Sequence, residues 1–212
     1  MTDFSELVQG YHRFRKQGWE GQRERWSELT EGQSPKVMVI ACSDSRVDPA
    51  IIFDSDPGEI FVVRNVAALV PPFETTPGRH GVSAALEFAV QFLQVPEILV
   101  LGHGRCGGCE AALTAAMKNA PRGQGGFVAD WIEMLDEARE RIVAAHGDHG
   151  RPALRAMEQE AVRVSLANLR TFPCIIDKEA SGDVRLHGAH FAIADGILYV
   201  LDEETDRFEP AA

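Results

Sequence analysis

The sequence has few cysteines and no long hydrophobic run. Four cysteines among 212 residues are too few for a disulfide framework, so we expect them to be free thiols or metal ligands. No apolar stretch reaches the ~18 residues that a membrane-spanning helix needs, and the N-terminal residues lack the apolar core of a secretory signal. These absences predict a cytoplasmic protein that has no membrane partner.

Basic residues are also scarce relative to acidic ones. The chain has 21 Lys and Arg against 32 Asp and Glu, which gives a formal net charge of −11 and a pI near 5.1. Such a charge argues against nucleic acid as a partner. It does not exclude a small anionic substrate, because an arginine or a metal ion can reverse the local field inside a pocket. The ordinary proportions of hydrophobic residues, 45%, and charged residues, 25%, exclude intrinsic disorder.

Apolar runs and helical spacing alternate along the chain. Short β-branched runs predict strands, and apolar residues three and four positions apart predict helices. Alternation over 184–201, with a turn at Asp195–Gly196, predicts a terminal hairpin or edge strands. The expected strands lie at 36–41, 60–63 and 98–101, and the expected helices lie within 4–29 and at 81–93, 108–118, 127–146 and 153–171.

This alternation predicts an α/β fold with a mostly parallel central sheet flanked by helices. We expect about four parallel strands and an edge strand, in a single domain that spans 1–212. Residues 1–30 would form a helical N-terminal arm, and residues 202–212 would form a flexible tail. In sheets of this kind, ligands bind beyond the carboxyl ends of the strands.

Candidate metal ligands follow two of the expected strands. Cys42 comes directly after the first, together with Asp44 and Arg46, and His103 and Cys106 follow the third. Two thiolates and one imidazole suit Zn²⁺. Three protein ligands leave the fourth position of the metal open, as is typical of catalytic zinc. The sequence therefore predicts a catalytic zinc site at this edge of the sheet.

Other interpretations of these residues stay open at this point. Residues 102–107 match a dinucleotide-binding fingerprint, but the chain continues into a loop at 119–126 rather than into the second strand that this motif requires. Cys106 and Cys109 could form a redox pair, which would leave His103 without a role. Cys109 could instead complete a structural Cys₃His zinc site, and spacing alone does not exclude it.

Three motifs resemble those of the β-class carbonic anhydrases. They are Ala-Cys-Ser-Asp-Ser-Arg-Val at 41–47, Gly-Glu-Ile-Phe-Val-Val-Arg-Asn at 58–65 and Gly-His-Gly-Arg-Cys-Gly-Gly at 102–108, in the order and spacing of that family. The similarity extends over 33–201. Residues 69–73 and 82–90 look closest to the plant-type branch, whose zinc site is open.

The resemblance implies a carbonate dehydratase, an enzyme that hydrates CO₂ reversibly to bicarbonate and a proton. It implies one Zn²⁺ per chain on Cys42, His103 and Cys106, with a water or hydroxide in the fourth position. It also implies that Asp44, paired with Arg46, accepts a hydrogen bond from that oxygen and orients it toward CO₂. The alternative is that Asp44 only caps the turn.

The resemblance further implies a substrate pocket at the interface of a homodimer or a higher even-numbered oligomer. Its apolar walls would suit CO₂, and a glutamine amide would contact a substrate oxygen. The plant-type branch has tyrosine at one of these positions, where this chain has Phe88. Cys109 falls where the family usually has an aliphatic residue, so it and Cys174 are implied to be core thiols. The matching pocket residues are Gln33, Phe61, Val66, Phe88 and Gly107.

A bicarbonate-regulated branch of the family has a different pocket, which is built from a tryptophan, an arginine and a tyrosine late in the chain. The corresponding residues here are Val39, Arg64 and Phe191. Without the indole N–H and the phenol O–H, that pocket lacks two hydrogen-bond donors for bicarbonate. We therefore expect Asp44 to stay paired with Arg46 and to leave zinc open to water.

Two other functions use the same residues. A sibling hydrolase would act on CS₂ or COS at the same zinc site, because a fold does not fix its substrate. A zinc-stabilised binding protein would have no catalysis, which the intact Asp44 and Arg46 disfavour. For proton export, His80 and His146 are candidates only because histidine titrates near neutral pH.

Overall fold

The structure, a computed structural model, describes residues 3–211. These residues fall into two compact units, divided between Ser34 and Pro35. The division lies close to residue 30, where we expect the helical arm to end. Among the residues that the structure describes, no helix is both long enough and apolar enough to cross a membrane.

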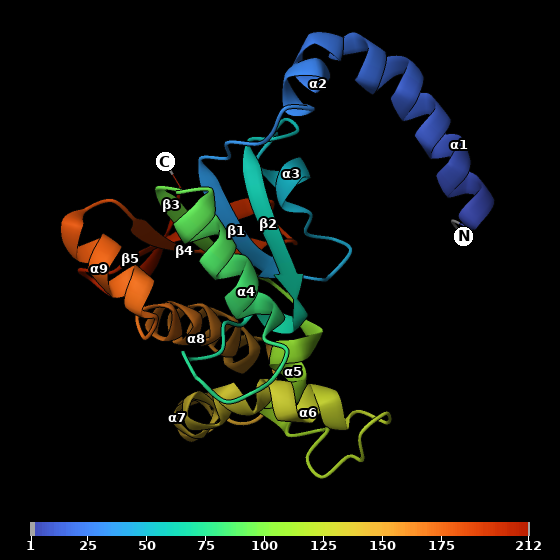
Figure 1. Ribbon diagram of the computed structural model, residues 1–212. Helices are drawn as coiled ribbons and strands as arrows, with labels where there is room; N and C mark the ends of the chain where they lie inside the picture. The colour runs from blue at the N-terminus through green and yellow to red at the C-terminus, as the bar shows by residue number, and fades with distance from the viewer. Residues whose placement is uncertain (1–2, 212) are drawn as a thin grey trace. The chain divides into compact units, whose positions relative to one another are not determined.

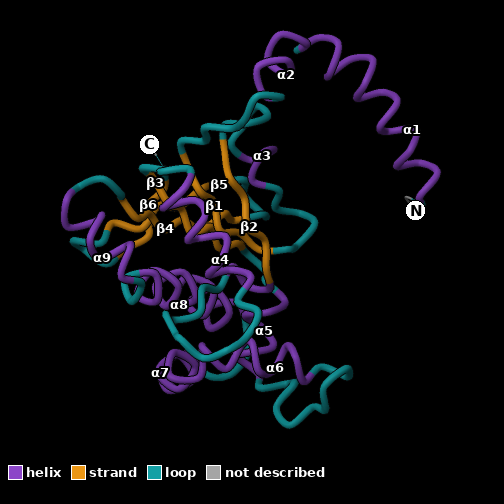
Figure 2. The backbone as a smooth tube through the Cα atoms, viewed as in Figure 1, coloured by secondary structure: helices purple, strands orange, loops and turns teal. Residues whose placement is uncertain are grey.

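The N-terminal unit is built of helices, as its apolar spacing predicts. Asp3 caps the first of them by accepting a hydrogen bond from the backbone N–H of Glu6 at 3.0 Å. Phe14 and Trp26 pack edge to face with ring centroids 5.8 Å apart, which joins the two α-helices. The unit comprises α1 (Phe4–Phe14), a π-helical turn (Arg15–Trp19) and α2 (Arg23–Leu29), coloured purple in Figure 2.

The larger unit contains a six-stranded sheet. Its strands are β1 (Val37–Cys42), β2 (Ile60–Asn65), β3 (Glu97–His103), β4 (Arg185–Ala192), β5 (Ile197–Asp202) and β6 (Arg207–Pro210). Their order across the sheet is β2-β1-β3-β4-β5-β6. The strands β2, β1, β3 and β4 are parallel, and β5 and β6 continue the sheet antiparallel. The mostly parallel sheet expected from the sequence is confirmed.

Helices cover one face of the sheet more fully than the other. The larger unit has α3 (Pro49–Ile52), α4 (Gly81–Glu87), α5 (Gly107–Thr114), α6 (Gly126–Ile132), α7 (Asp136–His146), α8 (Arg151–Leu169) and α9 (Pro173–Ser181). One core packs β1 and β3 against α4, α8 and α9, with Met38, Leu86, Leu166 and Ile175 buried. Figure 1 shows α4 running in front of the sheet, beside β1. The other face packs against the short α3 through Ile52.

A second core contains two of the expected metal ligands. It joins Cys42 and Cys106 to apolar residues of α5, α6 and α8, among them Leu113, Ile132 and Met157. The expected ligands therefore belong to a close-packed region of the protein, in which side chains have little room to move.

The helices differ from the expected pattern in three places. The helix expected at 127–146 is divided into α6 and α7 by a 3₁₀ turn (Glu133–Leu135). The helix expected at 108–118 ends at Thr114, because Ala115 adopts the left-handed conformation with φ 53°. The short α3 and α9 lack enough residues for a clear periodicity, although each has a proline at its first turn, where the fixed φ favours a helix start.

The C-terminal part confirms the expected hairpin and corrects the expected tail. β4 and β5 pair antiparallel, as the alternation predicts. Residues 202–212, expected as a flexible tail, instead include β6, which pairs with β5. Phe208 packs against the His190 ring with centroids 6.5 Å apart, and Arg163 binds Asp206 at 2.6 Å. These contacts hold the segment in place, and a strand of four residues is too short for its alternation to be recognised.

Candidate metal centre

The strand order brings the carboxyl ends of β1 and β3 together. These strands pair in parallel, with Ala41 beside Leu101. Cys42 is the last residue of β1, and His103 is the last residue of β3. The chain leaves β1 for β2 on one side and returns as β3 on the other side, which is the kind of switch point where α/β sheets bind ligands.

Three buried side chains converge at this edge, those of Cys42, His103 and Cys106. One potential ligand atom of each lies within 4.8 Å of the others. The two Sγ atoms are 4.0 Å apart, and the three residues are at most 6% exposed. Zn²⁺ binds sulfur and nitrogen ligands at about 2.0–2.3 Å, so donor atoms at these separations can share one ion.

The hydrogen bonding of His103 also fits a metal. Its Nδ1 lies 2.9 Å from the carbonyl oxygen of Gly104, so Nδ1 carries the hydrogen and donates it. Nε2 is then a free acceptor, and within residues 3–211 it is buried without a hydrogen-bond partner. Leaving such a nitrogen unpaired is costly, and a metal ion at this position would satisfy it.

The two thiols strongly favour their neutral form unless a cation lies between them. The hydrogen bond with Cys106, together with burial, raises the pKa of Cys42 to about 12. The hydrogen bond with Cys109, together with burial, raises the pKa of Cys106 to about 12. A bound cation reverses this preference, because metal ligation requires thiolates. Zinc binding should therefore release protons at neutral pH.

Asp44 and Arg46 form a two-point ion pair beside this cluster. Arg46 donates from Nε to Oδ1 at 2.9 Å and from Nη2 to Oδ2 at 2.6 Å. These hydrogen bonds hold the pKa of Asp44 well below its usual range. Asp44 Oδ2 lies 4.0 Å from His103 Nε2, so an ionised carboxylate stands next to the free nitrogen of the cluster.

Arg64 holds the loop that carries these residues. Its guanidinium donates to the carbonyl of Cys42 at 2.9 Å, to the carbonyl of Asp44 at 2.6 Å and to the carboxylate of Asp48 at 2.9 Å. Arg64 belongs to the motif at 58–65, but the motif does not predict that its guanidinium holds the loop after β1. The three bonds fix the backbone that follows β1 and thereby place Cys42 and Asp44.

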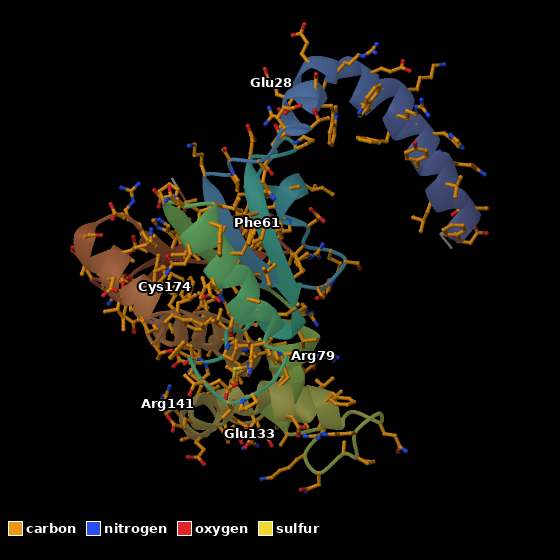
Figure 3. All side chains as sticks on the ribbon, viewed as in Figure 1. Glu28, Phe61, Arg79, Glu133, Arg141 and Cys174 are labelled. Atoms are coloured by element: carbon orange, nitrogen blue, oxygen red, sulfur yellow. The ribbon has the colours of Figure 1, made fainter. Side chains whose placement is uncertain are left out.

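Two of the expected pocket residues pack against each other. Phe61 on β2 and Phe88, which follows α4, have ring centroids 6.0 Å apart. Phe88 is 43% exposed and stacks on Phe92, with centroids 5.6 Å apart. Phe61 is labelled in Figure 3, close to β2 and α4. These rings form an apolar surface that is open to solvent in a single chain.

The other expected pocket residues lie in different surroundings. Val66 follows β2, and its carbonyl accepts a hydrogen bond from Trp131 Nε1 at 2.9 Å. Open space lies beside Gly107, because an added Cβ there would meet no described atom of this chain within 4 Å. An added Cβ at Gly108 would approach Val66 to 2.7 Å, so this glycine allows close packing. Gln33 is exposed in the N-terminal unit, and its contact with substrate stays a prediction.

Cys109 and Cys174 lie outside the ligand cluster. Cys109 is 2% exposed in the first turn of α5 and packs in the same core as Cys106. Among residues 3–211, the cluster of potential metal ligands consists of Cys42, His103 and Cys106. This favours three protein ligands over the Cys₃His alternative. Cys174 is half-buried on α9, and it packs against the core between the sheet and the helices α4, α8 and α9.

Sequence reasoning missed a buried carboxylate next to the cluster. Glu158 of α8 accepts a hydrogen bond from the backbone N–H of Cys106 at 3.1 Å and is 3% exposed. Its helix also carries Glu160, which is on the surface side and pairs with Arg141. No local pattern separates these two glutamates, so only the packing of α8 identifies the buried one.

Comparisons with known proteins agree with the geometry. A sequence-family model described as "Carbonic anhydrase" matches residues 37–198. A carbonic anhydrase of Pseudomonas aeruginosa is 37% identical over 206 residues, which cover 96% of this chain and 90% of that protein. A carbonic anhydrase of Synechocystis is 33% identical, over 92% of this chain and 70% of that protein.

Solved structures show the same fold. The β-carbonic anhydrase CcaA matches with a TM-score of 0.90 and 30% identity, over 99% of this chain and all of that one. A Coccomyxa β-carbonic anhydrase, solved with acetazolamide, matches with a TM-score of 0.82 and 28% identity, over 100% of this chain and 94% of that one. A structure from a study of two tetrameric β-carbonic anhydrases of Sordaria macrospora matches with a TM-score of 0.78 and 25% identity, over 93% of this chain and 96% of that one.

Proposed function

Since this chain belongs to the carbonic anhydrase family, in its β class, we propose that it uses zinc to hydrate CO₂ reversibly to bicarbonate and a proton. The observation that carries the proposal is the buried cluster of Cys42, His103 and Cys106 with the Asp44 carboxylate beside its free nitrogen. Three ligands would hold one Zn²⁺ per chain and leave a position for substrate chemistry.

Each residue around the proposed metal position has its own role in the reaction. When bound, Zn²⁺ supplies a Lewis acid that makes water nucleophilic near neutral pH, an effect well known from carbonic anhydrases in general. Asp44 accepts a hydrogen bond from the attacking oxygen and so turns a lone pair toward the carbon of CO₂. Arg46 holds that carboxylate at two points and keeps it ionised. Phe61 and Val66 offer apolar surface, which suits a small nonpolar substrate and excludes water.

The proposed activity can be tested on the purified protein. We expect rapid CO₂ hydration in a stopped-flow indicator assay, loss of that activity after dialysis against a zinc chelator, and recovery when one equivalent of Zn²⁺ is restored. CS₂ and COS are assayed in parallel. Preferential turnover of either sulfur compound would identify a hydrolase instead, and zinc binding without any turnover would identify a binding protein.

We also propose that the chain works as a homodimer or a higher even-numbered oligomer in the cytoplasm. Phe88 and Phe92 are 43% and 73% exposed, and they stack on each other beside Phe61. Exposed apolar side chains gathered beside a pocket residue such as Phe61 are typical of a surface that a partner covers. The tetrameric relatives from Sordaria macrospora support an even number of subunits.

We expect bicarbonate to inhibit this enzyme without cooperativity. Arg64 is already engaged by the Cys42 and Asp44 carbonyls and by the Asp48 carboxylate. Val39 and Phe191, which stand where the regulated branch has tryptophan and tyrosine, have no side-chain donor. Each missing donor would be worth about 1 kcal/mol to bound bicarbonate.

The measurement for this prediction is the initial rate of CO₂ hydration at increasing bicarbonate concentration. The expected Hill coefficient for inhibition is one. Sigmoidal inhibition would contradict the prediction, as would a crystal structure at neutral pH in which Asp44 has left Arg46 and binds the metal.

A further inference from the structure

Glu158 and His190 form a buried pair that the proposed mechanism leaves without a role. Their side chains are 3% and 2% exposed, and His190 Nε2 lies 3.0 Å from Glu158 Oε2. The other carboxylate oxygen, Oε1, accepts the hydrogen bond from the N–H of Cys106 at 3.1 Å. A carboxylate this deeply buried is costly unless its oxygens are hydrogen-bonded. One of its two partners belongs to a candidate metal ligand.

The hydrogen-bond pattern shows how the pair is arranged. His190 Nδ1 is buried and has no partner among the described residues. A hydrogen on Nδ1 would be buried without an acceptor, so the ring donates from Nε2 to Glu158. Glu158 then accepts at both oxygens, and its Oε1 is committed to the backbone of Cys106.

The hydrogen bond from Cys106 belongs to a peptide unit that is held at both ends. The N–H of this unit donates to Glu158, and its carbonyl, that of Arg105, accepts a hydrogen bond from Arg46 Nη2 at 2.9 Å. Arg105 has φ 59°, in the left-handed region that is strained for a non-glycine residue. The two hydrogen bonds stabilise this strained turn, which connects His103 to Cys106.

The close approach of α8 to the sheet allows Glu158 to reach Cys106. An added Cβ would lie 2.7 Å from Val162 if placed on Gly102 of β3, and 2.8 Å from Val162 if placed on Gly188 of β4. Val162 lies one turn after Glu158 on the same face of the helix. Glycine at both strand positions therefore lets α8 lie near enough to the sheet for the carboxylate to bond the turn.

From these contacts we propose that Glu158 is a positioning residue, held by His190, whose hydrogen bond aims the Cys106 thiolate at the metal. The inference rests on the zinc site of the proposed function. The hydrogen bond requires the full length of the glutamate side chain, and an uncharged acceptor of the same length can also make it. Reach and charge can therefore be separated by substitution.

Two substitutions make this separation. Glu158→Gln keeps the reach and an acceptor oxygen but removes the charge, whereas Glu158→Asp keeps the charge but is one methylene too short. We expect Glu158→Asp to lower the affinity for Zn²⁺ about 10- to 100-fold, the usual effect of losing a group that orients a metal ligand. In Glu158→Gln the oxygen can still accept from Cys106, but the NH₂ group faces His190 and forces its ring to carry the hydrogen on Nδ1. We therefore expect Glu158→Gln to lose stability while its zinc affinity stays within a few-fold of that of the original protein. Zinc affinity is measured by competition with a chromophoric chelator, and the visible spectrum of the Co²⁺-substituted protein reports the ligand geometry.

Ser165→Ala is the matched control. Ser165 is a fully buried polar residue of the same helix, and it bonds the carbonyl of Ala68 at 3.1 Å and the N–H of Val70 at 3.2 Å. Its loss should lower stability but leave zinc affinity and the Co²⁺ spectrum unchanged. Equal loss of zinc affinity in Ser165→Ala and Glu158→Asp would reduce Glu158 to a general stabilising residue.

The remaining outcomes also decide the question. Wild-type zinc affinity and an unchanged Co²⁺ spectrum in Glu158→Asp would overturn the inference, as would weaker binding by Glu158→Gln than by Glu158→Asp. A Glu158→Asp chain that stays unfolded even with excess Zn²⁺ by circular dichroism would show that Glu158 serves the fold. If the original protein itself binds no zinc, the proposed function fails, and that result is distinct from all of these.

Discussion

Cys106→Ser should lose zinc and, with it, CO₂ hydration, whereas Cys109→Ser should keep both. A serine hydroxyl is close in size to a thiol but stays protonated and is a poor zinc ligand. Cys106 Sγ lies 4.0 Å from Cys42 Sγ within the ligand cluster, while the equally buried Cys109 lies outside it. The zinc affinity of Cys106→Ser should fall by more than the roughly 10- to 100-fold that is usual when a residue supporting a metal ligand is removed.

The measurement is the zinc content per chain after dialysis against a mild chelator, together with the rate of CO₂ hydration. Circular dichroism of both variants shows whether the fold persists. The Cys109→Ser chain is the internal control, because it removes a thiol from the same turn of the same core. Loss of zinc from that variant would show that Cys109 is a fourth ligand and that the site is structural.

Asp44→Asn should fold and bind zinc yet hydrate CO₂ at least about 100-fold more slowly. The asparagine oxygen can still accept from Arg46, but an NH₂ group replaces one oxygen. In the original protein Arg46 Nη2 donates to Asp44 Oδ2 at 2.6 Å. If the NH₂ group takes the place of Oδ2, two donors face each other and this hydrogen bond is lost. The variant would also lack the negative charge that, in the proposed mechanism, accepts a hydrogen bond from the attacking oxygen and orients it. Stopped-flow rates at matched zinc content measure the effect.

The pH dependence of Asp44→Asn gives a second readout. Hydrogen bonds from Arg46 lower the pKa of Asp44 in the folded protein. Its contribution to stability is therefore present above the ordinary carboxyl pKa of about 4 and is lost as the pH falls through the lower folded value. Asp44 stays ionised over about pH 6 to 9, so the ratio of the two rates should not change across that range.

A surface ion pair supplies the control for Asp44→Asn. Asp130 pairs with Arg122 at 3.0 Å, and both side chains are more than half exposed. Asp130→Asn should leave the rate and the zinc content unchanged, because exposed pairs contribute little. Near-normal turnover by Asp44→Asn would show that Asp44 only caps its turn.

The first three of the six strands followed from local patterns. Apolar runs located β1, β2 and β3. Of these, β1 and β3 lie inside the sheet, and strands covered on both faces leave a continuous hydrophobic signal. The ends of α6, α7 and β6 did not follow, since each depends on a turn or on a pairing that one short segment does not encode. Ala115 illustrates this: its left-handed conformation ends α5, although alanine favours helices.

By itself, the sequence determined which residues could bind the metal. Cys42 and His103 each end a parallel strand, and parallel strands present their carboxyl ends at one edge of a sheet, so their proximity could be inferred before any coordinates. Only the tertiary structure decided what holds those ligands. Glu158 is 52 residues from Cys106, and which of the glutamates on α8 reaches it depends on how closely the helix packs against the sheet. Hydrogen-bond partners of this kind are chosen by distances of a few tenths of an ångström, which hydrophobic pattern and motif spacing do not specify.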